Sequence, residues 1–183
     1  PPLDYGFGVW LWADPDVAER QTQWTWGRAP GTAELDQLMA SSGDIRLDAA
    51  AGQDHDADRL IDLLTMIGPA VVISHSAGAP GVWVAASRRP DLVSAVVAVE
   101  PMGPPFAELP GIGPLSWGLS HAPVAYDPPV ADATQLADGQ RRTVPGFDGL
   151  AVLVVSGETS AIGAAAPRVA EDLTEDGAGR RIF

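Results

Sequence analysis

The sequence of 183 residues contains no cysteine and no lysine. The absence of cysteine excludes disulfide bonds, thiol nucleophiles and cysteine-ligated metals. Basic residues number only 11, all of them arginine, against 24 acidic residues, which gives a formal net charge of −13. This balance argues against nucleic-acid partners and against attraction to anionic membranes. No apolar run approaches the roughly 20 residues of a membrane-spanning helix, so we expect no membrane span.

What is present is typical of a globular protein: 46% of the residues are hydrophobic and 19% are charged, enough to form a buried core. The length predicts one domain covering residues 1–183. Within it, residues 101–147 are rich in proline and lack periodicity, so we interpret them as a cap or insertion. The chain starts at Pro1 and stops in Arg180–Phe183, which reads as the opening of a strand. We therefore expect that both ends are cut from a longer chain.

Three short, unbroken apolar runs punctuate the chain, at residues 69–74, 93–99 and 150–155. Such runs are typical of parallel strands buried on both faces. Segments with helical spacing alternate with them. We expect helices from Thr32 to about residue 41, over 54–67, over 77–88 and over 163–175, with a loop at 43–53, a strand or packed loop at 5–12 and a further strand from 181. Alternation of this kind predicts an α/β fold with a mostly parallel sheet.

One motif carries chemistry. Ser74-His75-Ser76-Ala77-Gly78 lies between an apolar strand and a helix. A serine on such a sharp turn is lifted above the sheet, and this context predicts Ser76 as a nucleophile. The backbone N–H of Ala77 and the positive end of the following helix would stabilise a developing oxyanion. The usual pattern begins with glycine, where this chain has Ser74. The alternative is a small-residue turn that only packs a helix on a strand.

A serine nucleophile needs a base, and the base needs an orienting acid. Glu100 directly follows the run 93–99, at the carboxyl end of a strand, where the active sites of open α/β sheets collect. Glu158 follows the next run, but the position at which many hydrolases carry their acid in that turn is Ser160. We therefore favour Glu100 as the acid and keep Glu158 as the second candidate. The simpler reading of Glu100 is a solvated carboxylate at a strand end.

Residues 71–106, VVISHSAGAPGVWVAASRRPDLVSAVVAVEPMGPPF, resemble the serine–glutamate core of the α/β-hydrolase superfamily. More narrowly, they resemble bacterial esterases whose acid is a glutamate followed by proline after the sixth strand. Residues 117–130 resemble the cap insertion of that group. The resemblance implies an incomplete α/β-hydrolase sheet, with Ser76 as nucleophile, Glu100 as acid and the Ala77 N–H as one oxyanion donor.

That group carries its catalytic histidine in a loop after the last strand, so the resemblance implies a base beyond Phe183. The second oxyanion donor of the group also has no counterpart in this chain. Three histidines are present. We interpret His55 as a surface or capping residue and His75 as a residue beside the turn. His121 lies in the insertion, where it is a weak candidate for the base.

Other residues with chemical potential have simpler interpretations. Asp54, Asp56 and Asp58 have the spacing of a calcium loop but lack its glycine and its downstream glutamate, so we interpret them as the first turn of a helix. Trp10, Trp12 and Trp117 would line an apolar acyl pocket or, more simply, pack in the core and cap. No metal and no cofactor is expected.

The function predicted from the sequence is hydrolysis of a small carboxylic ester through an acyl-enzyme, with Ser76 attacking the carbonyl carbon. Two alternatives stay open. One is hydrolysis of a lactone or amide, or acyl transfer, at the same site, because the cap sets specificity. The other is a binding domain of the same fold that lacks a base and does no chemistry.

Overall fold

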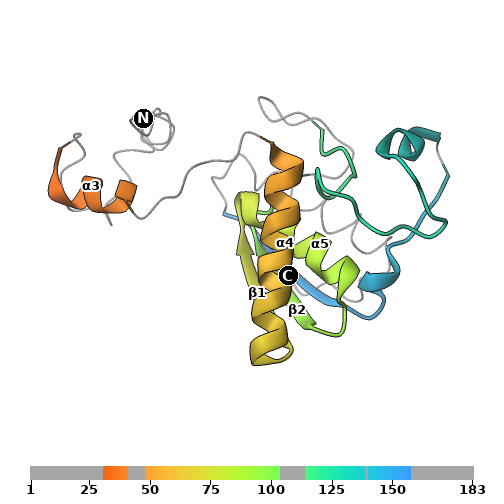
Figure 1. Cartoon of the computed structure of the whole chain (residues 1–183), viewed down its shortest axis with the longest axis horizontal. Helices are drawn as coiled ribbons and strands as arrows, with labels where there is room; N and C mark the ends of the chain where they lie inside the picture. Colours follow the sequence, from red (N-terminus) through yellow and green to blue (C-terminus); the bar gives the residue numbers. More distant parts are fainter. Residues whose placement is uncertain (1–30, 41–47, 104–113, 139, 158–183) are drawn as a thin grey trace. The chain divides into compact units, whose positions relative to one another are not determined.

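The computed structural model describes residues 31–40, 48–103, 114–138 and 140–157 (Figure 1). The chain divides into two compact units, residues 1–46 and residues 47–183. The first contains the helix α3 (Ala33–Ala40), which confirms the short helix expected there. The predictions for residues 5–12, 163–175 and 181–183, and for Glu158 and Ser160, lie outside the described residues.

The second unit contains a parallel sheet of three strands, in the order β1 (Ala70–His75), β2 (Val93–Val99) and β3 (Ala151–Val155). All three apolar runs are therefore strands, within one residue of their predicted bounds at each end. Helix and strand alternate from β1 to β2, as a parallel pair requires. The α/β class is thus confirmed for the described part of the chain.

Helix α4 (Ala49–Ile67) precedes the sheet and begins five residues before the prediction. The predicted loop at 43–53 is wrong from residue 49 onward, because the Asp48 side chain caps the helix by accepting a 3.0 Å hydrogen bond from the Ala51 N–H. The first turn consequently contains no acidic residue. Gly68 ends the helix as expected, with φ of 94° and its N–H bonded to Leu64. No described helix is long and apolar enough to cross a membrane.

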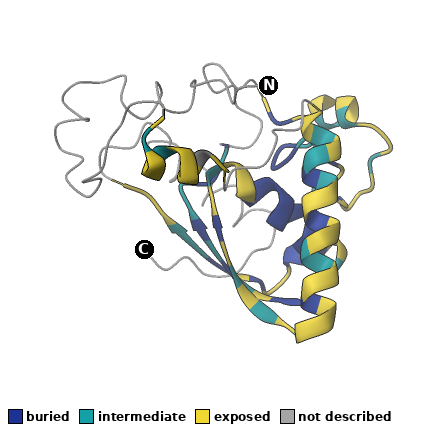
Figure 2. Cartoon of the chain, turned by 60° about the vertical axis from the view of Figure 1, so that its left-hand side comes forward, coloured by how far each residue is buried: buried dark blue, intermediate teal, exposed yellow. Residues whose placement is uncertain are grey.

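Helix α5 (Ala79–Arg88) follows β1 through a single turn of 3-10 helix, η1 (Ser76–Gly78). Its residues from Ala79 to Ser87 are all buried, and it packs against α4 and against the sheet (Figures 1 and 2). Trp83 is fully buried, with its ring edge toward Phe147 at a centroid distance of 6.2 Å. Helix α5 is therefore the centre of the hydrophobic core, and α4 covers it with an outer face that stays exposed.

Burial differs between the two faces of β1. Ser74 is 7% exposed, whereas Val71 is 57% and Ile73 is 73% exposed. Successive side chains of a strand point to opposite faces, so one face packs inward and the other does not. The expectation of burial on both faces is wrong for β1, because α5 packs on one face and its opposite face stays in contact with solvent.

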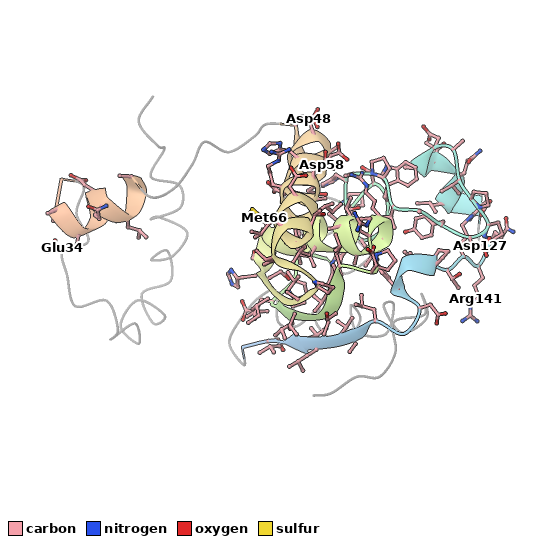
Figure 3. The ribbon with its side chains drawn as sticks, turned by 60° about the horizontal axis from the view of Figure 1, so that its bottom comes forward. Glu34, Asp48, Asp58, Met66, Asp127 and Arg141 are labelled. Atoms are coloured by element: carbon pink, nitrogen blue, oxygen red, sulfur yellow. The ribbon has the colours of Figure 1, made fainter. Side chains whose placement is uncertain are left out.

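The described part of residues 101–147 is irregular, as predicted. It contains the short 3-10 helices η2 (Ala133–Asp138) and η3 (Pro145–Phe147). Asp127 and Thr143 form an isolated antiparallel bridge within it, and Asp127 and Arg141 are labelled in Figure 3. Phe147 carries the end of this segment into the core against α5. The segment is therefore attached to the body of the unit, whereas its role as a cap stays a prediction.

Candidate active site

Ser76 lies immediately after β1, where the chain turns from the strand into η1 and α5. Its φ is 48°, in the left-handed region that side chains other than glycine rarely adopt. Ala77 is exposed. It lies at the start of the 3-10 turn, ahead of the first N–H that donates within the turn, so the Ala77 N–H has no acceptor there. No described residue hydrogen-bonds to the Ser76 hydroxyl. The turn thus presents a hydroxyl and a backbone donor at one end of the sheet.

Glu100 lies immediately after β2 and also has a left-handed backbone, with φ of 45°. Its N–H donates to the carbonyl oxygen of Val155 at 2.7 Å. Its carboxylate oxygen Oε1 accepts the N–H of Gly157 at 2.9 Å. Both the main chain and the side chain of Glu100 are therefore attached to the end of β3.

The topology brings Ser76 and Glu100 to the same edge of the sheet. His75 and Val99 are paired in the parallel register, so the next residue of each strand occupies an equivalent position. The N–H of Met102 donates to the Ser76 carbonyl oxygen at 3.1 Å, which joins the two turns directly. In the described part of the chain, Ser76 and Glu100 are the only residues other than glycine with positive φ.

A left-handed backbone conformation costs free energy at a residue that carries a side chain. A left-handed residue with a side chain costs roughly 1–2 kcal/mol, and conformations of this kind persist where the surrounding structure enforces them. The described hydrogen bonds of the two turns provide that enforcement for Glu100 and for Ser76. Strain of this kind clusters at functional sites, which makes these two strand ends the leading candidate.

Ser74 occupies the position at which the usual motif has glycine. It is buried, and its hydroxyl has no hydrogen-bond partner among the residues that the structure describes. The turn forms nevertheless, so a serine at this position is compatible with the left-handed backbone of Ser76. A small residue is what the motif predicts at this position, whereas the unpaired hydroxyl could not be predicted from the sequence.

The three histidines lie on three different segments of the chain. His55 is exposed on α4, and His75 is exposed at the end of β1. His121 lies in the irregular segment, where its ring atom Nδ1 is 3.2 Å from the Ser116 hydroxyl. Among the described contacts, none of the three imidazoles hydrogen-bonds to Ser76. The ring of His121 is thus partnered by Ser116.

Gln53 was not anticipated from the sequence. It is buried on α4, and its Oε1 accepts the N–H of His121 at 2.6 Å and that of Ala122 at 3.4 Å. Next to it, a Cβ on Gly81 of α5 would lie 3.6 Å from the Gln53 carbonyl oxygen. Gln53 therefore attaches the irregular segment close to the first turns of α5. The signal that could have indicated it is a polar residue on the same helical face as Ala57.

The Asp-rich stretch of α4 does not form a helix start. Asp54 and Asp58 both pair with the guanidinium of Arg88 on α5, the second pair at 3.3 Å. Figure 3 labels Asp58 midway along α4. The described residues contain no group of three or more acidic or histidine side chains arranged to hold a metal ion. These aspartates thus connect two helices.

Comparison with known proteins gives one informative similarity. The chain is 32% identical over 113 residues, 61% of its length, to a protein named "Probable secreted lipase phiG" from a fungal species (strain ATCC 74256). The matched region spans 31% of that lipase, so the chain corresponds to about a third of it. No protein-family profile and no solved structure matches the chain.

Proposed function

We propose that this chain carries the nucleophile and the acid of a serine hydrolase that cleaves carboxylic esters. One observation carries the proposal: Ser76 and Glu100, at equivalent ends of adjacent parallel strands, are the two described non-glycine residues with left-handed backbone. The similarity to a fungal lipase supports the same class of reaction. The proposed fold is that of an α/β-hydrolase in which residues 101–147 form a cap.

In this proposal the Ser76 hydroxyl attacks the ester carbonyl carbon while its proton passes to a histidine imidazole. Glu100 orients that imidazole and stabilises its charged form. The negative charge on the carbonyl oxygen is stabilised by the Ala77 N–H and the positive end of α5. Collapse of the intermediate breaks the bond to the alkoxide, which takes the proton from the imidazolium. Water then hydrolyses the acyl-enzyme by the same steps.

The base is assigned to a histidine outside these 183 residues. His121 is the alternative within the chain, but its Nδ1 is already within hydrogen-bond distance of Ser116. Free imidazole in solution can take the part of a missing histidine side chain, because it brings the same basic nitrogen. The chain itself therefore permits a test of the site.

The test is labelling of the chain with a fluorophosphonate probe at increasing imidazole concentration, followed by peptide mapping. We expect the adduct on Ser76, a rate that rises with imidazole, and loss of the adduct in Ser76→Ala. Glu100→Gln should lower the imidazole-dependent rate by at least tenfold, whereas His121→Ala should leave it unchanged. If the gene encodes residues after Phe183, the complete protein should label without imidazole.

Two results would contradict the proposal. An adduct on another serine would remove Ser76 from its role. Absence of any adduct, both with imidazole and in the complete protein, would favour the second candidate, a binding domain without chemistry. That candidate rests on the observation that no described imidazole bonds to Ser76. Where the adduct does form on Ser76, a panel of esters, lactones and amides given to the complete protein would define the substrate class.

A further inference from the structure

The carboxylate of Glu100 has two oxygens in different surroundings. Oε1 accepts the N–H of Gly157 at 2.9 Å. No described residue donates a hydrogen bond to Oε2. The contact with Gly157 spans 57 positions of sequence and joins the ends of two neighbouring strands. The side chain is thus held at one oxygen and left open at the other.

The contact with Gly157 replaces a regular bond of the sheet. Val99 pairs with Val155 in the parallel register, and the Glu100 N–H continues the ladder by donating to the Val155 carbonyl oxygen. In a regular parallel ladder the next bond would run from the Gly157 N–H to the Glu100 carbonyl oxygen. The left-handed backbone of Glu100 interrupts that pattern, and its carboxylate accepts the N–H instead.

This arrangement restricts the carboxylate. A glutamate side chain has several rotatable bonds, and ordering it costs conformational entropy. A backbone N–H that donates to a charged oxygen forms one of the stronger hydrogen bonds in proteins, and its direction selects a single rotamer. The donor lies two residues after the end of β3, which is itself bonded along its length to β2. The end of this strand therefore determines where the second oxygen lies.

We propose that Gly157 is a positioning residue for the acid: its N–H holds Oε1 of Glu100 so that Oε2 faces the base. This inference rests on the proposed function, and it assigns a role to the backbone of Gly157. From the sequence, Glu158 is the second candidate for the acid. In the present assignment Gly157 supplies the hydrogen-bond donor, and Glu100 supplies the carboxylate.

The chemistry of the backbone defines the variant that tests this role. Only proline removes the N–H of residue 157, so Gly157→Pro is the informative change. Ser156→Pro is the matched control, because N–H groups alternate in direction along a strand and that of Ser156 points away from β2. Both variants place one proline at the same strand end, and only one of them removes the donor to Glu100.

The first measurement is NMR of the Gly157 amide in this chain, which requires no catalysis. We expect Glu100→Ala to shift the amide proton upfield and to accelerate its exchange with solvent by at least tenfold. Amides within β3 should keep their exchange rates. An unchanged Gly157 amide in Glu100→Ala would overturn the inference, because the contact would then be absent in solution.

The second measurement is the imidazole dependence of Ser76 labelling. We expect Gly157→Pro to raise the half-saturating imidazole concentration about tenfold, with Ser156→Pro within twofold of the parent chain. In a Glu100→Gln background, Gly157→Pro should have no further effect, because its role acts through the carboxylate. An equal effect in both backgrounds, or equal effects of the two prolines, would overturn the inference in favour of a merely structural role.

The two measurements separate this inference from the proposed function. A parent chain that shows no imidazole-dependent adduct at Ser76 contradicts the serine hydrolase, and with it the role given to Gly157, even where the amide responds to Glu100→Ala. Imidazole-dependent labelling with an unresponsive Gly157 amide supports the hydrolase and contradicts the positioning role alone.

Discussion

Helix α5 keeps nine consecutive residues, Ala79–Ser87, out of solvent, whereas the strand ends beside it carry two residues with left-handed backbone, Ser76 and Glu100. The first region gains stability from close packing. The second loses stability through strain that hydrogen bonds hold in place. Substitutions in the two regions should therefore have opposite effects on stability: changes in the packed helix should destabilise the protein, and relief of strain at the strand ends should stabilise it.

The largest effect is expected at Trp83. Trp83→Ala would remove a fully buried ring and its edge contact with Phe147, which should lower the free energy of unfolding by about 3–5 kcal/mol. Urea denaturation followed by tryptophan fluorescence and circular dichroism measures this. Met66→Ala, at a residue of α4 that is 77% exposed, is the control and should change stability little. Similar losses in both variants would contradict the central position of α5.

A smaller loss is expected at Gly146. A Cβ there would lie 2.7 Å from the Ala86 carbonyl oxygen and from the Ser87 Cα. These are backbone atoms of α5, so Gly146→Ala should cost about 1–3 kcal/mol of unfolding free energy. The control is Gly78→Ala, where a Cβ would have nothing within 4 Å. Thermal unfolding of both variants checks the prediction, and a neutral Gly146→Ala would show that the approach of η3 to α5 is loose.

The opposite sign is expected at the strand ends. Ser76→Gly and Glu100→Gly each remove a side chain from left-handed backbone, and glycine adopts that backbone without steric cost. Each should raise the free energy of unfolding by about 1 kcal/mol relative to alanine at the same position. Chemical denaturation compares the glycine and alanine variants. Higher stability in the alanine variants would remove strain as an argument for the site.

The smallest effect concerns Asp138, which lies far from both regions in sequence. Hydrogen bonds from the Arg142 guanidinium and from the Gln140 N–H lower the pKa of Asp138 to about 2 from its ordinary value of 3.8. A lowered pKa stabilises the folded state above pH 3.8, and this contribution disappears as the pH falls through about 2. Asp138→Asn should therefore be less stable than the parent chain at neutral pH.

The measurement is urea denaturation of both chains at pH 7, 4 and 2.5. The difference in stability should be small, because the Asp138 side chain is 44% exposed, and it should narrow as the pH falls. A difference of constant size across this range would mean that the loss comes from packing of the substituted residue and does not depend on the charge.

Sequence patterns predicted the strands of this fold better than the helix boundaries. Unbroken runs gave β1, β2 and β3 almost to the residue, because their short length and β-branched residues favour strands over helices. The start of α4 was missed because Asp48 caps a stretch of alanines with no apolar periodicity. The exposed face of β1 was also missed, because an apolar side chain such as Ile73 does not indicate whether another element covers it.

The candidate site was predictable to the extent that it depends on strand ends. Ser76 and Glu100 follow neighbouring strands, and parallel topology is sufficient to bring them to one edge. The roles assigned to them remain predictions that the proposed labelling addresses. The contact of Glu100 with Gly157 was beyond sequence reasoning, because it depends on the register of β3 and on the left-handed backbone of Glu100. Neither the register nor the backbone conformation can be inferred from the residue types.

The exposed face of β1 should make this chain prone to association. Val71 and Ile73 expose apolar surface beside each other on a strand at the edge of the described sheet, and such surfaces promote association between molecules. The chain should therefore be retained on phenyl resin and enhance the fluorescence of an apolar dye. Threonine at these two positions keeps the β-branched shape and adds a hydroxyl, so this pair of substitutions is the first choice for improving solubility.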